Sequence, residues 1–570
     1  MQLNCWTRIC RTDNMGKMTR NTILFFAVAI AAVSPFAAAA QPEAVKKAAK
    51  AVLSLTTYDA AGNVVANSFG AFVSPDGQAV APWKPFVGAV KAVVADTDGN
   101  EYEVSALMGA DELYDICRIA TDRKPAAYAP PCDQPSEAGD KLWAMGFSIK
   151  KQKGEQVEVE RVESFHGGYA YYVLAGNSTK KEEGRPLFAA DGRLVGLMQY
   201  SSGGTQPHST DASYPGSFRL TGLSINDAVL RQSGIRVALP PDGDDARLTL
   251  MIAQQGDSAR YAAYVDDFIK AFPGMADGYQ EKAKSLMAVG NCVEAAALME
   301  ECIAKADNKD EAHSAYASLV LQTAAGDSVC GELTLRRALA EAEAAYAAKP
   351  LPAYLHQKAQ VLFAVGSYGE AHDLLLGLSQ GELRSGEVFY EVSQCRAKLG
   401  KPLEQILEML DSAVVSSQGQ SAAPYVLERG RLLDEAGLHR QAVADYNKYD
   451  TLMLGRASHA FYFTKYQCEM KLRQYQQALN DIAHAIVLNR AEPTYYACMA
   501  SLQLKVNRLE DAVKTADMCI AVAPGYSDPY IIKGVALGEL GQKDEALQAL
   551  RLAKEIGDDR AADLIEKYKP

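Results

Sequence analysis

The C-terminal part of the chain repeats itself with a period of 34 residues. Alanines recur at this spacing, and so do tyrosines that precede each of them by 16 residues: Ala478, Ala512 and Ala546, and Tyr462, Tyr496 and Tyr530. A unit of this length is one helical hairpin, and the small residues mark where its two helices approach closely. One hairpin cannot bury its own apolar face, so neighbouring units must stack. The spacing predicts an all-α solenoid.

The repeat resembles the tetratricopeptide repeat. The stretch from Leu540 to Leu547, LGQKDEAL, is similar to the turn and second-helix start of that family, and Pro524 closes the preceding unit. Weaker copies extend the array backwards, with an insertion between residues 311 and 350. We expect the solenoid to occupy residues 240–570 as about nine helical hairpins, the end ones degenerate.

This resemblance implies a concave groove that binds a peptide or protein partner. In the register of the family, the side chains that line the groove are Gln467, Lys471, Ser501 and Lys505. The two lysines lie 34 residues apart and would bind an acidic segment or a C-terminal carboxylate of the partner. The alternative is that these residues form an ordinary solvated helix face.

The first half of the chain has the pattern of an all-β domain. From residue 41 to residue 239, short apolar runs alternate with turn signals such as Asp76-Gly77 and Asp98-Gly99. Asp-Gly pairs between apolar runs indicate hairpins, because the turn needs a residue that tolerates positive φ. Many short strands at this spacing predict a barrel or a sandwich.

Four ordered segments of this domain resemble the trypsin-like serine peptidases, especially bacterial periplasmic ones. The segments are Ser68–Gly77 (SFGAFVSPDG), Gly109–Ile119 (GADELYDICRI), Leu142–Phe147 (LWAMGF) and Lys181–Leu197 (KEEGRPLFAADGRLVGL). The last is similar to the family's G-N-S-G-G-P-L-F stretch around the nucleophile. The resemblance implies a double β-barrel.

The same resemblance assigns the catalytic triad to Lys84, Asp115 and Glu183. Family members have histidine, aspartate and serine at these places, so only the aspartate is kept. The triad needs a hydroxyl nucleophile and an imidazole that accepts its proton. A lysine ammonium has no lone pair, and a carboxylate has no hydroxyl. We therefore expect no catalytic residue here, and either a lysine held between two carboxylates or two side chains in solvent.

A rearranged triad is the alternative within this domain. Its histidines are His166, expected in a turn before two glycines, and His208, expected in a solvated polar loop. Ser178 belongs to a Gly-Asn-Ser triplet but lies five residues too early relative to the family motif. These positions do not favour a shifted site.

The N-terminus has the pattern of a secretory signal peptide. Lys17 and Arg20 precede an apolar run from residue 23 to residue 33, and three alanines ending at Ala40 form a cleavage site. Translation then starts at Met15 or Met18. The sequence predicts removal of residues 1–40, a periplasmic or secreted protein, and no permanent membrane span.

Charge and cysteine usage narrow the possible partners. The net charge of −12 disfavours binding to nucleic acid. No Cys or His spacing typical of a metal site is present, and no cofactor motif, so neither a metal nor a cofactor is expected. The interpretation is an exported protein-binding scaffold. The alternatives are an active serine-type endopeptidase with an unconventional site, and a non-catalytic sensor whose β domain binds peptides by strand addition.

Overall fold

A computed structural model describes residues 41–149, 152–177, 179–200, 206–324 and 333–569. The predicted signal segment, residues 1–40, and Ser178 lie outside the described residues. The chain divides into two compact units, the first ending at Phe268 and the second beginning at Ile269. Each unit is described by itself.

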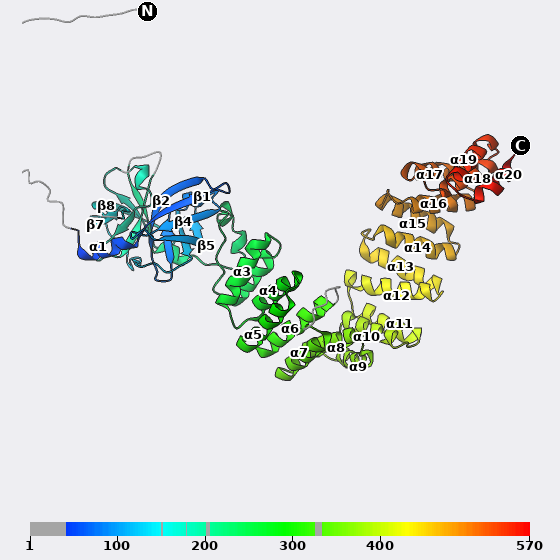
Figure 1. Cartoon of the computed structure of the whole chain (residues 1–570), viewed down its shortest axis with the longest axis horizontal. Helices are drawn as coiled ribbons and strands as arrows, with labels where there is room; N and C mark the ends of the chain where they lie inside the picture. Colours follow the sequence, from blue (N-terminus) through cyan, green and yellow to red (C-terminus); the bar gives the residue numbers. More distant parts are fainter. Residues whose placement is uncertain (1–40, 150–151, 178, 201–205, 325–332, 570) are drawn as a thin grey trace, which may run out of the picture. The chain divides into compact units, whose positions relative to one another are not determined.

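The first unit contains two closed antiparallel barrels of six strands each (Figure 1). The first barrel has the strand order β1-β2-β3-β6-β5-β4. Its strands are β1 (Val52–Tyr58), β2 (Val64–Phe72), β3 (Gln78–Ala81), β4 (Lys91–Ala95), β5 (Glu101–Asp111) and β6 (Ile116–Thr121). A short helix, α1 (Glu43–Ala48), precedes them. The predicted Asp76-Gly77 hairpin joins β2 to β3, and Gly77 has φ 87°.

The second barrel has the order β10-β11-β12-β9-β8-β7. Its strands are β7 (Lys141–Met145), β8 (Gly154–Phe165), β9 (Tyr169–Leu174), β10 (Pro186–Phe188), β11 (Leu194–Gln199) and β12 (His208–Asp211). The double β-barrel predicted from the sequence is confirmed. The expectation of a solvated loop around His208 is wrong, because this residue begins β12 and pairs with Val173 of β9.

Apolar side chains fill each barrel and also join the two. Leu53, Phe72 and Trp83 belong to the core of the first barrel, and Tyr172 and Leu187 to that of the second. A third cluster combines residues of both barrels: Val52, Ala71, Val80 and Ile116 from the first, and Trp143, Phe165, Phe188 and Leu194 from the second. This shared core fixes the loops of one barrel against those of the other.

The first helix after the barrels and most of the second belong to the first unit. These helices are α2 (Gly243–Ala253) and α3 (Ser258–Ala271), so helices replace strands close to the predicted boundary at residue 239. The Tyr264 hydroxyl donates to the carbonyl of Val237 at 2.8 Å, and Arg236 forms an ion pair with Asp267 at 2.6 Å. These bonds explain why the compact unit continues to Phe268.

The second unit is a succession of helix pairs, and the helical solenoid predicted from the 34-residue period is confirmed (Figure 1). In the described part of the chain, the pairs are α4 (Ala276–Ala288) with α5 (Cys292–Lys305), α6 (Lys309–Ala324) with α7 (Leu335–Ala348), α8 (Pro352–Val365) with α9 (Tyr368–Leu378), α10 (Gly386–Lys398) with α11 (Leu403–Val415), α12 (Ala423–Glu435) with α13 (His439–Met453), α14 (His459–Lys471) with α15 (Tyr475–Leu488), α16 (Pro493–Lys505) with α17 (Leu509–Val522), and α18 (Asp528–Glu539) with α19 (Lys543–Glu555), followed by α20 (Arg560–Tyr568). The periodic Ala478, Ala512 and Ala546 are all fully buried.

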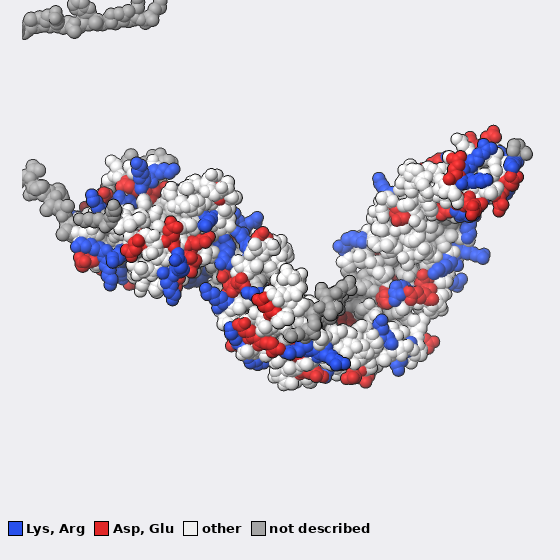
Figure 2. Space-filling view, viewed as in Figure 1, with Lys and Arg blue, Asp and Glu red and all other residues white. Residues whose placement is uncertain are grey.

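None of the helices described here is both long and apolar enough to span a bilayer. On the face shown in Figure 2, basic and acidic side chains are interspersed over the described residues rather than gathered by sign.

Candidate functional site

Lys84 and Asp115 come together on the first barrel. Lys84 begins the short 3-10 helix η2 (Lys84–Phe86) after β3, and Asp115 lies in the turn between β5 and β6 with φ 46°. The Lys84 backbone N–H donates to Asp115 Oδ1 at 2.8 Å, and its ammonium nitrogen lies 3.1 Å from Asp115 Oδ2. The ammonium is at ion-pair distance but outside hydrogen-bonding geometry, so the buried Oδ2 has no hydrogen-bond donor in the described structure.

Glu183 reaches the same place from the second barrel. It directly follows the 3-10 helix η3 (Lys180–Glu182), lies three residues before the start of β10, and is half-buried. Burial raises the pKa of the Glu183 carboxyl, nearby Asp115 raises it further, and Lys84 and Lys180 oppose the rise. Within the described residues Glu183 forms no ion pair with Lys84. The three triad positions thus share one electrostatic environment, with direct contact only between Lys84 and Asp115.

Backbone amides beside Glu183 are engaged within their own turn. The Glu183 N–H donates to the Lys180 carbonyl at 3.3 Å, and the Glu182 N–H to the Thr179 carbonyl at 2.9 Å. The Glu182 carboxylate accepts a hydrogen bond from the Thr179 N–H at 2.7 Å, which completes a capping box. An oxyanion hole needs N–H groups aimed at the substrate oxygen. The Glu183 N–H is instead bonded to the Lys180 carbonyl of its own turn.

Gly184 allows this turn to pass close to the first barrel. It has φ 85°, and a Cβ there would lie 2.5 Å from the Phe69 carbonyl oxygen. The Ser68 hydroxyl donates to the Glu183 carbonyl at 3.2 Å. This glycine is retained from the family motif because any side chain would collide with the β2 backbone.

Sequence reasoning missed the role of Arg185, which stands at the third glycine of the family motif. Its side chain is buried and donates to Glu182 at 2.9 Å, to Glu155 at 3.4 Å and to the Ala144 carbonyl at 3.1 Å. A charged residue between Gly184 and Pro186 was the available signal. Arg185 ties the turn that carries Glu183 to β7 and β8.

The two histidines of the domain do not supply a base to this site. His166 lies in the turn between β8 and β9, as predicted, and its Nε2 is 3.6 Å from Asp111. His208 stacks on Tyr171 with a centroid distance of 5.6 Å. Among the described residues, neither histidine hydrogen-bonds or ion-pairs with Asp115.

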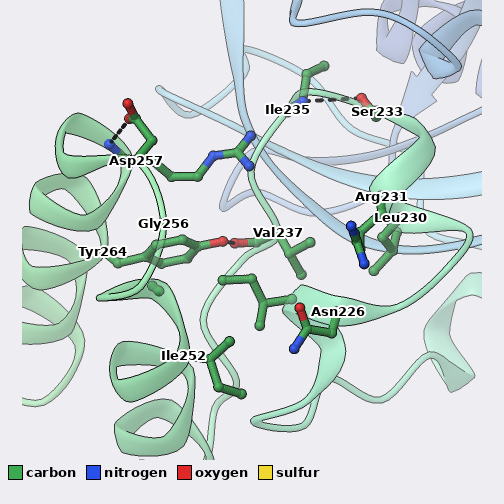
Figure 3. Close-up of a pocket in the computed structure, with 13 residues that line it drawn as sticks. Asn226, Leu230, Arg231, Ser233, Ile235, Val237, Ile252, Gly256, Asp257 and Tyr264 are labelled. Atoms are coloured by element: carbon green, nitrogen blue, oxygen red, sulfur yellow. Dashed lines mark hydrogen bonds between the residues drawn. The ribbon is translucent and has the colours of Figure 1, made fainter. Parts of the chain in front are cut away.

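A separate cavity of about 540 Å³ lies between the segment after β12 and helices α2 and α3 (Figure 3). Apolar side chains such as Leu230, Val237 and Ile252 line it, together with Arg231 and Tyr264. The Tyr264 hydroxyl is bound to the Val237 carbonyl, so it is not free for a ligand. Lys84, Asp115 and Glu183 do not line this cavity.

The four groove candidates of the repeat are exposed. Gln467 and Lys471 lie on α14, and Ser501 and Lys505 on α16. The Lys471 ammonium lies 3.0 Å from Asp434 Oδ1, and the Lys505 ammonium lies 5.2 Å from the centre of the Tyr475 ring. Both lysines are therefore engaged with residues of their own chain.

Asp434, His439 and Cys468 form a cluster that the sequence spacing did not reveal. Their potential ligand atoms lie within 4.8 Å of one another. His439 Nδ1 is 2.7 Å from Asp434 Oδ1, and the Lys471 ammonium contacts the same carboxylate. Burial and the adjacent Asp434 raise the pKa of the Cys468 thiol to about 12, which favours the protonated form. The Lys471 cation thus already compensates Asp434, so this cluster is a network of internal bonds.

Comparisons with known proteins agree with the predicted repeat. No family model matches the chain. It is 29% identical over 98 residues to the small glutamine-rich tetratricopeptide repeat-containing protein 2 of Saccharomyces cerevisiae, and 26% identical over 98 residues to the TPR repeat-containing thioredoxin TDX of Arabidopsis thaliana. Each match covers 17% of this chain, and it spans only 28% and 26% of the two relatives.

Among solved structures, similar ones include two proteases. One is the active form of the Rv3671c protease of M. tuberculosis, with 14% identity and a TM-score of 0.29, covering 40% of this chain and 96% of that one. Another is the serine endoprotease of Yersinia pestis, with 17% identity and a TM-score of 0.26, covering 33% of this chain and 65% of that one. The double-barrel assignment rests on the strand order given above.

Proposed function

We propose that this chain is a protein-binding scaffold whose β unit has the architecture of a trypsin-like peptidase without its chemistry. The observation that carries the proposal is the Lys84–Asp115 pair. In a working triad the aspartate orients an imidazole, which accepts the proton of the nucleophile. Here the aspartate is paired with an ammonium 3.1 Å away, which is donor-only. Glu183 offers no hydroxyl, and its N–H donates to Lys180.

The binding role is assigned to the helical repeat. Stacked hairpins present a continuous surface to extended segments of other proteins, and Gln467 and Ser501 are exposed at the positions that face the groove in tetratricopeptide repeats. Export to the periplasm or beyond is part of the proposal. It is supported by the signal-like pattern before Gln41 and by Cys292, which is disulfide-bonded, as oxidising compartments permit.

A fluorophosphonate probe tests the absence of peptidase chemistry. The full chain should remain unlabelled under conditions in which trypsin is labelled completely, and it should leave unfolded casein intact. Ser178→Ala is the matched variant, since this serine is the nearest alternative nucleophile in the sequence. Labelling of the parent chain that this or another single serine substitution abolishes would establish the peptidase alternative.

Site-specific photo-cross-linking tests the binding role in the full chain. A benzophenone side chain at Gln467 or Ser501 should capture a partner from the producing cells. The control position is Leu113, which is 81% exposed beside the Lys84–Asp115 pair. Capture at residue 113 alone would favour the peptide-binding sensor, in which the β unit takes the ligand.

A further inference from the structure

The hairpin α14–α15 buries more carboxyl groups than ammonium groups. The Lys465 ammonium lies 3.2 Å from Asp481 Oδ2 and 3.8 Å from Asp450 Oδ2. Lys465 and Asp481 are both buried, and so is Glu469, which is 2% exposed and one helical turn after Lys465. One ammonium thus faces three carboxyl groups. Buried charges are costly unless they are paired, so the third carboxyl group must either hold a proton or be compensated by a cation.

Glu469 is the carboxyl group without a cation of its own among the described residues, and it shares with Asp481 a side-chain hydrogen bond that requires a proton between the two groups. Its Oε2 is buried and has no hydrogen-bond partner among the described residues. Burial raises the pKa of Glu469 to about 8, Asp481 contributes to the rise, and Lys465 opposes it. An unsatisfied buried polar atom is uncommon in folded proteins and calls for an explanation such as an unfilled ligand position.

A pocket of about 230 Å³ opens onto this carboxyl group. Glu469, Lys465 and Asp481 line it together with Val443, Asn447, Gln474, Gln477 and Asn480. Apart from Lys465 and Val443, every one of these side chains carries an oxygen that accepts hydrogen bonds. The volume corresponds to roughly eight water molecules at about 30 Å³ each. It is large enough for a small planar cation.

The adjacent hairpins show that the extra carboxyl group is not needed for folding. In α12–α13 the equivalent pair is Arg429 and Asp445, with the Arg429 Nε 2.7 Å from Asp445 Oδ2, and Leu433 stands where α14 has Glu469. In α16 the equivalent residue is Gln503, which is also buried. An apolar and a neutral side chain both serve at this position of the repeat. Glu469 therefore adds a property that packing does not require.

We propose that this pocket binds a guanidinium cation, carried by an arginine side chain of a partner protein, with Glu469 as its principal acceptor. Guanidinium has five N–H donors and no acceptor, which complements a lining of carboxyl and amide oxygens. Its planar fork matches a carboxylate, and its weak hydration lowers the cost of burial. The inference rests on the proposed protein-binding role of the repeat and is independent of the β unit.

Isothermal titration calorimetry of the full chain with L-argininamide tests the proposal. L-citrullinamide is the matched ligand, because a neutral ureido group replaces the guanidinium. We expect argininamide to bind and citrullinamide not to bind. Glu469→Gln should weaken the binding of argininamide at least about tenfold, as expected for loss of a hydrogen-bonded charge. The control variant Glu510→Gln removes an exposed carboxylate on α17 and should leave the affinity unchanged.

Titration at pH 7 in two buffers of different ionisation enthalpy adds an independent readout. Because Glu469 is largely protonated at this pH in the free protein, guanidinium binding should release a proton from the parent chain and none from the Glu469→Gln variant. Glu469→Leu introduces the residue found at the equivalent position of the previous hairpin, Leu433. This variant replaces Glu469→Gln in both titrations if the glutamine variant does not fold.

Three outcomes would overturn the proposal. The first is equal affinity of argininamide for the parent chain and for both Glu469 variants. The second is Glu469-dependent binding of calcium chloride without binding of argininamide, which would make the pocket a metal site. The third is binding of neither probe, which would leave Glu469 as a protonated buried side chain without a ligand.

Discussion

Each unit of the molecule contains a lysine paired with a buried aspartate, and the two pairs differ in their access to water. Lys84 lies 3.1 Å from Asp115, and Lys465 lies 3.2 Å from Asp481. The Lys84 side chain is 63% exposed, whereas the Lys465 side chain is 8% exposed. A solvated lysine neutralises its aspartate at little desolvation cost, but a buried one must also be compensated by its surroundings.

A third carboxyl group stands beside each pair. Burial and the paired aspartate raise the pKa of Glu183 and of Glu469, and the paired lysine opposes the rise in both. Only for Glu469 is the shift large, to about 8. The difference follows from burial, because Glu183 remains half-exposed to water. The same three residue types therefore form a solvated cluster in the β unit and a buried pocket rich in carboxyl groups in the repeat.

Tryptophan fluorescence and circular dichroism allow the two pairs to be tested separately. The chain has three tryptophans, of which Trp83 and Trp143 lie in the barrels and Trp6 lies outside the described residues. Fluorescence therefore reports on the β unit, and ellipticity at 222 nm reports mainly on the helical repeat.

The largest effect is expected for Lys465→Met. The substitution leaves Asp481, Asp450 and Glu469 without their cation, and removing one partner of a buried pair costs about 3–5 kcal/mol. Urea unfolding at pH 7, followed at 222 nm, should show this loss, while the fluorescence transition stays unchanged. A loss below about 1 kcal/mol would mean that the carboxyl groups are solvated or protonated and that the two pairs are equivalent.

Glu469→Gln should have the opposite sign and depend on pH. The ordinary glutamate pKa is 4.5 and that of folded Glu469 is about 8, so the folded state holds this proton more tightly than the unfolded chain. This bound proton stabilises the folded parent protein. The stabilisation is fully present below pH 4.5 and is lost as the pH rises through 8. The variant should therefore be more stable than the parent by about 2–4 kcal/mol at pH 9, and nearly equal to it at pH 4.5.

Urea titrations at these two pH values measure the difference directly. Glu510→Gln is the control, because an exposed carboxylate on α17 should give no such dependence. A Glu469→Gln variant that is less stable than the parent at pH 9 would show that the carboxylate has a partner after all.

The architecture of both units was predictable because it rests on repeated local patterns. Asp-Gly turns such as Asp76-Gly77 require a left-handed residue, and the periodic alanines such as Ala512 are buried wherever they recur. The ordered motifs also assigned Lys84 and Asp115 to neighbouring triad positions, and their side chains lie 3.1 Å apart in the structure. Features of this kind can be recognised from residues that are adjacent in sequence or that recur at a fixed spacing.

The features that escaped prediction depend on contacts between distant segments. Glu469 in α14 resembles any helical glutamate in sequence, and only its packing against Asp481 and Lys465 removes it from water. Arg185 is explained by Ala144 and Glu155, which precede it by 41 and 30 residues. His208 was assigned to a loop because the polar residues around it conceal a short strand paired with β9.

Lys84→Met should have a smaller effect than the substitutions in the repeat. Asp115 loses the ammonium but keeps the hydrogen bond from the backbone N–H of residue 84, so a loss of about 1–2 kcal/mol is expected. Fluorescence-detected urea unfolding measures it next to Trp83. Adding Glu183→Gln should restore part of the loss, because one of the two carboxylates no longer repels the other. If the second substitution does not restore stability, Glu183 does not interact electrostatically with the Lys84–Asp115 pair.

The smallest effect on stability is expected for Lys471→Met, at most about 0.5 kcal/mol. Lys471 is half-exposed, and Asp434 keeps His439 at 2.7 Å when the lysine is removed. Urea unfolding at 222 nm checks this value. Because stability barely changes, any large loss of partner cross-linking at Gln467 in this variant must come from a lost ligand contact. Unchanged cross-linking would instead assign Lys471 to the internal network around Asp434 and remove it from the groove.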